Sequence, residues 1–346
     1  MKKALQMIMA VLLLLGMLGT QVFAAGAVEN TAENKSTTGE QSFRFKSTLQ
    51  LPENTIVPSV EVSYAIEGIA GTGCIAGPSE ATVGSVQFSN SDVPEDSASG
   101  GIVEITKDVT VTFPANTFKA VGIYRYKITQ TIPANTGVVA ESPITQYLDV
   151  FVQNNDGDTG LEVAYFVLAS TANDTASSTS YTGKSDGFQN TYNSHTLTVT
   201  KKVAGNQGDK KQSFSFPITI TGAQGKTYKY ELSNRKTGKF TAGTEQTLQL
   251  KHGETIKITG LTAWDTYTVS EAQAAEYITT YKIDNGSVTP YNTALTDTIS
   301  ADRTITFINT KDANTPTGVI LTFMPYILMI LAGFVVASLF LRRKRR

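Results

Sequence analysis

The chain has 346 residues, with 29 Lys and Arg against 30 Asp and Glu. Seven of the basic residues and none of the acidic ones lie at the two extreme ends, so the body between them carries a net charge of about −8. An acidic body excludes nucleic-acid binding, which needs clustered positive charge. The single cysteine, Cys74, excludes an internal disulfide.

The N-terminus has the order of a secretory signal peptide. Lys2 and Lys3 precede an apolar run at residues 10–17, and small residues flank a cleavage site after Ala24. The run is too short to cross a hydrocarbon core about 30 Å thick, which favours removal over a retained anchor. We therefore expect residues 1–24 to be cleaved on export. Residues 25–40, rich in Thr, Asn and Glu, are expected to form a disordered leader.

The body alternates apolar and polar residues in short runs, for example at 214–220, 255–258 and 303–307. Gly, Asn and Asp turns separate these runs. A strand with a lysine, then an aromatic strand, then a strand ending on an asparagine occurs twice in that order. The sequence predicts an all-β fold of two tandem Ig-like β-sandwich domains, at residues 41–193 and 194–312.

Three polar residues of the second domain, Lys201, Glu271 and Asn309, continue apolar strand faces when side chains are counted in twos. Burial lowers the pKa of a lysine and raises that of a glutamate, so both would tend to be uncharged. A neutral amine is a nucleophile, and a protonated Glu271 could polarise the Asn309 carbonyl, which would give a Lys–Asn isopeptide bond. A buried salt bridge beside a hydrogen-bonded asparagine is the alternative, because alternation does not show that three strands are neighbours.

A resemblance favours the crosslink. Residues 197–203, the loop at 205–209, Val269-Ser-Glu271 and residues 304–312 resemble the C-terminal domain of streptococcal backbone pilins. The resemblance extends from Phe43 to Gly318 and also implies the two-domain sandwich. In that family a lysine, a glutamate and an asparagine form a self-catalysed isopeptide bond, which implies these roles for Lys201, Glu271 and Asn309.

The first domain matches the family less well. Lys46 and Asn190 stand where the family has its lysine and asparagine, but Gln130 replaces the glutamate and cannot shuttle a proton. Lys46 is also out of phase with the apolar face, although a β-bulge could restore it. Glu67 or Glu141 could supply the acid. The resemblance therefore leaves the Lys46–Asn190 bond as an open expectation.

The C-terminus combines three elements. Residues 319–341 are a charge-free, mostly apolar run long enough to span a bilayer, and the basic tail 342–346 would hold its end in the cytoplasm. Asn314, Thr315, Pro316, Thr317 and Gly318 precede the run. Together, residues 313–346 resemble a sortase sorting signal, with the first two motif positions altered. The resemblance implies cleavage between Thr317 and Gly318, attachment to peptidoglycan and a Gram-positive cell surface reached through a membrane-bound precursor.

A polymer also needs an acceptor amine. In the resembling pilins this lysine lies just before the strand that carries the first-domain asparagine, and Lys184 matches that position after a one-residue shift. Its Gly, Ser, Thr and Asp neighbours predict an exposed loop. Lys127 and Lys210 are the next candidates.

We therefore predict a structural protein, the major subunit of a sortase-assembled pilus, with a non-polymerised wall-anchored adhesin as the alternative. His195 and His252 lack a catalytic or metal-binding context, so we expect no enzyme, cofactor or metal site. Trp264 is expected in the core. The expected partners are sortase, other copies of the chain, peptidoglycan, and host surfaces or minor pilins.

Overall fold

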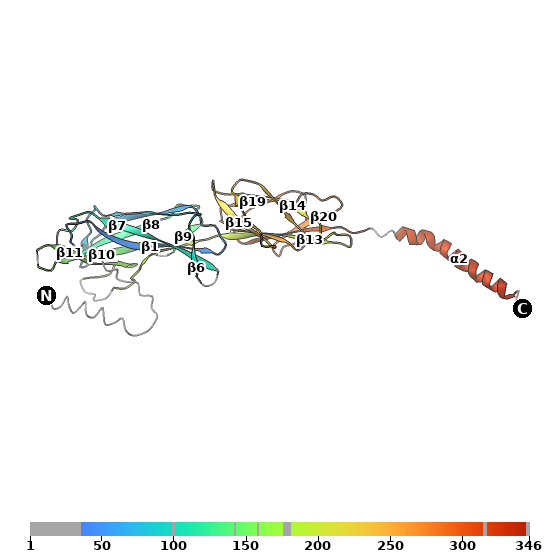
Figure 1. Ribbon diagram of the computed structural model, residues 1–346, viewed down its shortest axis with the longest axis horizontal. Helices are drawn as coiled ribbons and strands as arrows, with labels where there is room; N and C mark the ends of the chain where they lie inside the picture. The colour runs from blue at the N-terminus through green and yellow to red at the C-terminus, as the bar shows by residue number, and fades with distance from the viewer. Residues whose placement is uncertain are drawn as a thin grey trace.

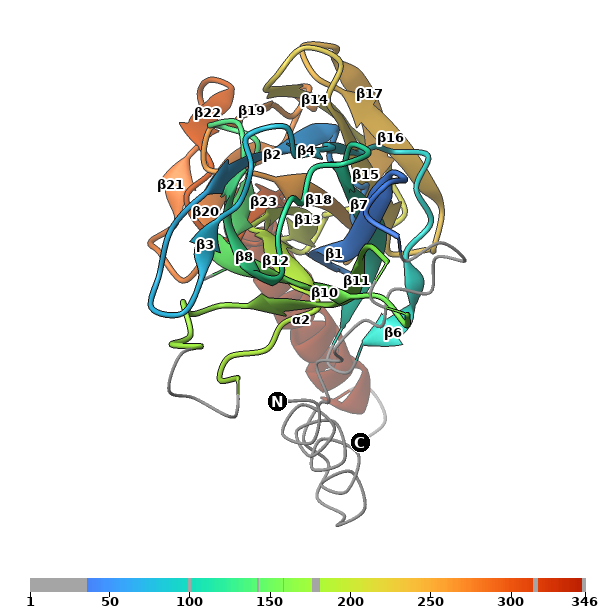
Figure 2. The ribbon, with the colours of Figure 1, turned by 90° about the vertical axis from the view of Figure 1, so that its left-hand side faces the viewer.

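A computed structural model describes residues 36–98, 101–141, 143–157, 159–175, 181–313 and 317–343. The predicted signal peptide and most of the predicted leader lie outside these residues. Figure 1 shows two β-sandwiches arranged end to end along the long axis, followed by the helix α2 (Thr317–Arg343). Viewed along that axis, one sandwich lies behind the other (Figure 2).

The first sandwich has one six-stranded sheet in the order β4-β7-β1-β12-β9, with β6 paired to β7. The facing sheet has the order β11-β10-β8-β2-β5, with β3 paired to β8. The strands are β1 (Gln41–Pro52), β2 (Val60–Gly68), β3 (Ile75–Ala76), β4 (Thr82–Val83), β5 (Val86–Phe88), β6 (Glu95–Ala98), β7 (Ile102–Phe113), β8 (Gly122–Thr131), β9 (Val138–Ala140), β10 (Thr145–Asn154), β11 (Leu161–Ala169) and β12 (Gly187–Tyr192).

The second sandwich packs a seven-stranded sheet, β16-β15-β18-β13-β23-β20-β21, on a four-stranded sheet, β17-β14-β19-β22. Its strands are β13 (His195–Ala204), β14 (Phe214–Thr221), β15 (Thr227–Leu232), β16 (Thr237–Thr241), β17 (Gln246–Leu250), β18 (Thr255–Leu261), β19 (Thr266–Val269), β20 (Ile278–Ile283), β21 (Thr289–Pro290), β22 (Leu295–Thr298) and β23 (Arg303–Thr310).

The two sandwiches share one feature that positions the site: the first and last strands are parallel neighbours. β1 pairs with β12, and β13 pairs with β23. Each sandwich also encloses its own apolar core, because alternate residues of its strands face inward. The predicted all-β fold of two tandem sandwiches is confirmed.

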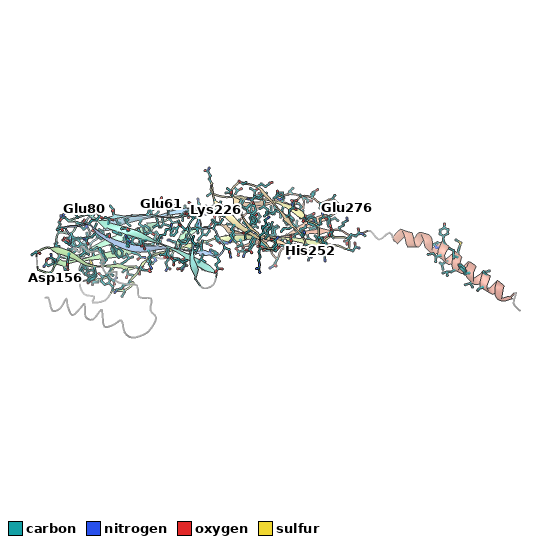
Figure 3. The ribbon with its side chains drawn as sticks, viewed as in Figure 1. Glu61, Glu80, Asp156, Lys226, His252 and Glu276 are labelled. Atoms are coloured by element: carbon teal, nitrogen blue, oxygen red, sulfur yellow. The ribbon has the colours of Figure 1, made fainter. Side chains whose placement is uncertain are left out.

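A short connection and direct contacts join the sandwiches. β12 ends at Tyr192, whose hydroxyl donates to the carbonyl oxygen of Gly260 in the second sandwich at 2.9 Å. Asn54 accepts two more hydrogen bonds across the junction, from Lys229 at 3.0 Å and Thr259 at 2.8 Å. Figure 3 labels Lys226 at this end of the second sandwich and Glu276 at its opposite end, nearer α2. Glu276 accepts a hydrogen bond from Lys311, which directly follows β23, so the asparagine-bearing end of β23 lies at the end of the sandwich nearer α2.

Two sequence predictions are corrected here. The predicted disordered leader ends in an ordered turn at residues 36–40, where Thr37 is buried and its backbone N–H donates to the Leu161 carbonyl at 3.0 Å. Trp264 is 67% exposed rather than in the core. It lies in the turn between β18 and β19, where the neighbouring Asp265 takes the buried position.

Among the residues that the structure describes, no helix combines the length and apolarity that crossing a membrane requires. The predicted span 319–341 extends beyond residues 325–338, the part of α2 whose side chains are described. The predicted span therefore stays an expectation from the sequence.

Candidate crosslinking site

Lys201, Glu271 and Asn309 meet inside the second sandwich. Lys201 lies on β13 and Asn309 on the adjacent β23, whose parallel register places Lys201 opposite Phe307 and Val203 opposite Asn309. Glu271 follows β19, a strand of the facing sheet. Lys201 and Asn309 are completely buried, and Glu271 is 4% exposed. The three predicted residues therefore converge from both sheets.

The carboxylate of Glu271 lies between the amine and the amide. Lys201 Nζ donates to Glu271 Oε1 at 2.8 Å and to Oε2 at 3.0 Å. Asn309 Nδ2 donates to Oε1 at 2.6 Å. Asn309 Oδ1 has no hydrogen-bond partner among the described residues. One acid thus contacts both groups that an amide exchange would join.

The surroundings destabilise the charged forms of this pair relative to water. The Lys201 amine lies 4.2 Å from the centroid of the Phe214 ring. Burial lowers the pKa of Lys201 to about 8, although the hydrogen bond and charge of Glu271 oppose the shift. Burial likewise raises the pKa of Glu271, against the opposing effects of Lys201 and Asn309. Proton transfer from the amine to the carboxylate is therefore easier here than in water.

Tyr291 fixes the backbone that carries the acid. The Glu271 N–H donates to the Tyr291 hydroxyl at 3.0 Å, and the Tyr291 ring packs 5.3 Å from that of Phe307. Because Phe307 lies directly opposite Lys201 in the strand register, one aromatic contact links the acid to the reacting strands. Sequence reasoning did not identify Tyr291, since its loop carries no strand pattern.

The structure contradicts the expected Lys46–Asn190 bond. Lys46 is exposed, and β1 pairs with β7 and β12 without the bulge that would turn its side chain inward. Asn190 is completely buried and accepts a 2.9 Å hydrogen bond from Gln130 Nε2. Period-two geometry therefore puts the amine and the amide on opposite faces of one sheet.

Neither alternative acid reaches Asn190. Glu67 is exposed and pairs with Lys127 at 2.7 Å. Glu141 is exposed and accepts a 2.8 Å hydrogen bond from Thr191. Glu67 lies on β2 and Glu141 directly after β9, both exposed, and among the described residues no carboxylate hydrogen-bonds the Asn190 side chain.

Lys184 lies in the segment before β12, where its backbone bridges to Ala169. Its side chain is partly exposed. The other two candidate acceptors differ: Lys127 is ion-paired with Glu67, and Lys210 is exposed in the second sandwich. Lys184 therefore combines access with an ordered backbone.

A buried ion pair holds the segment that carries Lys184. Arg125 donates to both oxygens of Asp149 at 2.7 Å and to the backbone oxygen of Asn173 at 2.5 Å. Tyr181 donates to Asp149 at 2.6 Å. Counting side chains in twos along β8 and β10 puts Arg125 and Asp149 on the strand face that points away from the core. The sequence of these two strands does not show that a distant segment of the chain covers this face. The one sequence signal for this buried ion pair is that two opposite charges, each flanked by apolar residues, lie on two strands.

We expect Asp149→Ala to destabilise the first sandwich by about 3–5 kcal/mol, because it leaves the buried Arg125 charge uncompensated. Urea unfolding followed by circular dichroism measures the loss, and hydrogen exchange should place it in β8 and β10. Glu67→Ala, which removes an exposed partner of Lys127, is the matched control and should leave the unfolding midpoint nearly unchanged. Equal effects of the two substitutions would contradict a structural role for the buried pair.

The predicted sorting motif lies mostly outside the described residues. Asn314, Thr315 and Pro316 fall outside them, and Thr317 and Gly318 begin α2 without described side chains. Cleavage at this motif therefore stays a prediction from the sequence.

Comparison with known proteins finds a matching domain family and relatives among pilus proteins. Residues 195–311 match a family described as a domain of unknown function, DUF7601. The chain is 29% identical to a pilin of Streptococcus pyogenes serotype M1 over 261 residues, which covers 69% of this chain and 72% of the pilin. It is 30% identical over 124 residues to the pilus tip adhesin Cpa of Streptococcus pyogenes, covering 36% of this chain and 18% of the adhesin.

Solved structures show the same fold. The major pilin from Streptococcus pyogenes matches with a TM-score of 0.52 at 20% identity, covering 81% of this chain and 100% of that one. The major pilin protein T3.2 from the same species matches with a TM-score of 0.53 at 20% identity, covering 78% and 99%.

Fold and site together define a protein built from tandem β-sandwiches, in which a lysine and an asparagine on the first and last strands of one domain meet an acid from the facing sheet. The chain is homologous to the streptococcal pilins. This homology supports a structural subunit of a pilus rather than an enzyme, with a surface location.

Proposed function

We propose that the chain is the shaft subunit of a sortase-assembled, wall-anchored pilus and that its second sandwich closes itself with a Lys201–Asn309 isopeptide bond. The observation that carries the bond is the buried contact of Glu271 with both Lys201 and Asn309. An ion pair alone would not require a buried carboxamide on the same carboxylate.

The reaction needs no external reagent. Glu271 takes a proton from Lys201, and the neutral amine attacks Asn309 Cγ. The carboxyl group gives that proton to the departing amide nitrogen, which leaves as ammonia, and then takes the second proton that the attacking nitrogen loses as the new amide forms. A bond between Lys201 Nζ and Asn309 Cγ replaces the bond between Asn309 Cγ and Nδ2.

The bond suits a protein under tension. It would join adjacent strands at opposite ends of the domain sequence, so a pull on the two ends of the second sandwich would load a covalent bond. By analogy with a disulfide, closing a loop of about 100 residues contributes about 4–5 kcal/mol through the unfolded state.

We expect a sortase to cleave between Thr317 and Gly318, leaving Thr317 as the acyl donor. The motif, the apolar run and the basic tail support this step. Mass spectrometry of wall-released protein should find a last peptide that ends at Thr317 or continues into a linked partner. Recovery of wall-released protein carrying residues beyond Gly318 would contradict the cleavage.

An immunoblot of wall extracts tests the shaft assignment. A covalent polymer gives a ladder of high-mass bands, whereas a non-polymerised adhesin with the same anchor gives a single band. The shaft subunit would contact sortase, peptidoglycan, further copies of itself and minor pilins or host surfaces.

A further inference from the structure

The two sandwiches can be aligned through their closing strands. In the second, Lys201 lies opposite Phe307, two residues before Asn309. In the first, Ser47 lies opposite Phe188, two residues before Asn190. Ser47, and not Lys46, therefore occupies the position of the crosslinking lysine. It is completely buried, as Lys201 is.

The acid also has a counterpart. Gln130 lies on β8 of the facing sheet, is 5% exposed and donates to Asn190 Oδ1 at 2.9 Å. It therefore lies beside its asparagine as Glu271 lies beside Asn309, although in the second sandwich the asparagine is the donor. Tyr64 donates to Gln130 Oε1 at 3.3 Å. Burial raises the pKa of Tyr64 to about 12, against the opposing contact with the Ser47 hydroxyl, so its phenol is not a base at neutral pH.

We propose that the first sandwich carries a latent crosslinking site, with Ser47 at the lysine position, Gln130 at the acid position and Asn190 in place, so that hydrogen bonds alone hold β1 to β12. This inference rests on the proposed crosslink of the second sandwich. The site lacks both requirements of the reaction: a serine hydroxyl beside an amide stays protonated, and Gln130 cannot relay a proton.

The proposed assembly explains why this closure is dispensable. If the preceding subunit is attached at Lys184 and the next one at Thr317, tension enters just before β12 and leaves through the second sandwich. β1 and the strands up to β11 lie off this path, whereas β13 and β23 span the loaded domain. A covalent bond between β1 and β12 would therefore carry little of the load.

The test restores the missing groups. Full chains carrying Ser47→Lys, Gln130→Glu or both are digested and mapped by mass spectrometry, alongside the unchanged chain. The unchanged chain should show the β13 peptide linked to the β23 peptide, with β1 and β12 peptides separate. The double variant should add a β1–β12 pair joined with loss of one ammonia, and neither single variant should do so.

A lysine at position 47 needs space, and overpacking a core is destabilising. A second variant, with Tyr64→Ala added to the double substitution, removes the ring beside Ser47 to provide it. Hydrogen exchange of β12 shows whether each variant is folded.

Each outcome decides the proposal. A β1–β12 linked peptide in the unchanged chain would overturn it, and so would a folded double or triple variant without the new link. If neither variant folds, separate β1 and β12 peptides in the unchanged chain support the missing closure. Absence of the β13–β23 link in the unchanged chain would instead reject the proposed function of the second sandwich.

Discussion

Glu271→Ala is expected to leave Lys201 and Asn309 unlinked. The unchanged mature ectodomain should be lighter than its sequence by one ammonia, and the variant should recover that mass once its own substitution is accounted for. The physical reason is that Glu271 is the one carboxylate among the described residues that contacts both reacting groups. Intact-mass spectrometry measures the difference.

The same variant should lose stability on two counts. Loss of the bond removes about 4–5 kcal/mol of loop-closure stabilisation. Loss of the carboxylate also leaves the Lys201 amine buried without its partner, which costs a further amount of about 3–5 kcal/mol when the lysine is charged. Asn309→Ala separates the two effects, because it blocks the bond but keeps the Lys201–Glu271 pair.

Glu276→Ala is the matched control for the mass measurement. Glu276 also hydrogen-bonds a lysine, Lys311, but this pair lies on the surface. The control should therefore keep the loss of ammonia. A full sequence mass for the unchanged ectodomain would reject the crosslink outright, and an intact crosslink in Glu271→Ala would reject the role of the acid.

Period-two patterning predicted much of this site because strand alternation is a local property. Lys201 and Asn309 face the core as counted, and the same counting put Lys46 on the outer face. The resemblance to the pilins placed Lys46 at the crosslink position, and there the local geometry was the better guide. Alternation did not show that β13 and β23 are neighbours, since strand pairing is set by the whole sheet.

The residues that the sequence did not identify owe their burial or their role to contacts with distant parts of the chain. Arg125 and Asp149 are buried by a segment that arrives from beyond β11, so their own strands look half-exposed. Ser47 was passed over because its role appears only when the β1–β12 and β13–β23 registers are compared. In both cases the missing information is a contact between distant parts of the chain.

Lys184→Arg in the native host is expected to collapse the high-mass ladder of wall extracts to monomer, because arginine keeps the charge but offers no amine for attack on acyl-Thr317. The segment that presents Lys184 is tied to the buried Arg125–Asp149 pair, so its backbone is held while its amine stays accessible. Lys202→Arg, at an exposed lysine of the second sandwich that is not a candidate acceptor, is the matched control and should leave the ladder unchanged. A persistent ladder in Lys184→Arg would eliminate this lysine as the sole acceptor, and Lys127 and Lys210 would be tested next. A single band in the unchanged strain would instead favour the non-polymerised adhesin. Both hypotheses include the wall anchor, but only a pilus shaft requires an acceptor lysine.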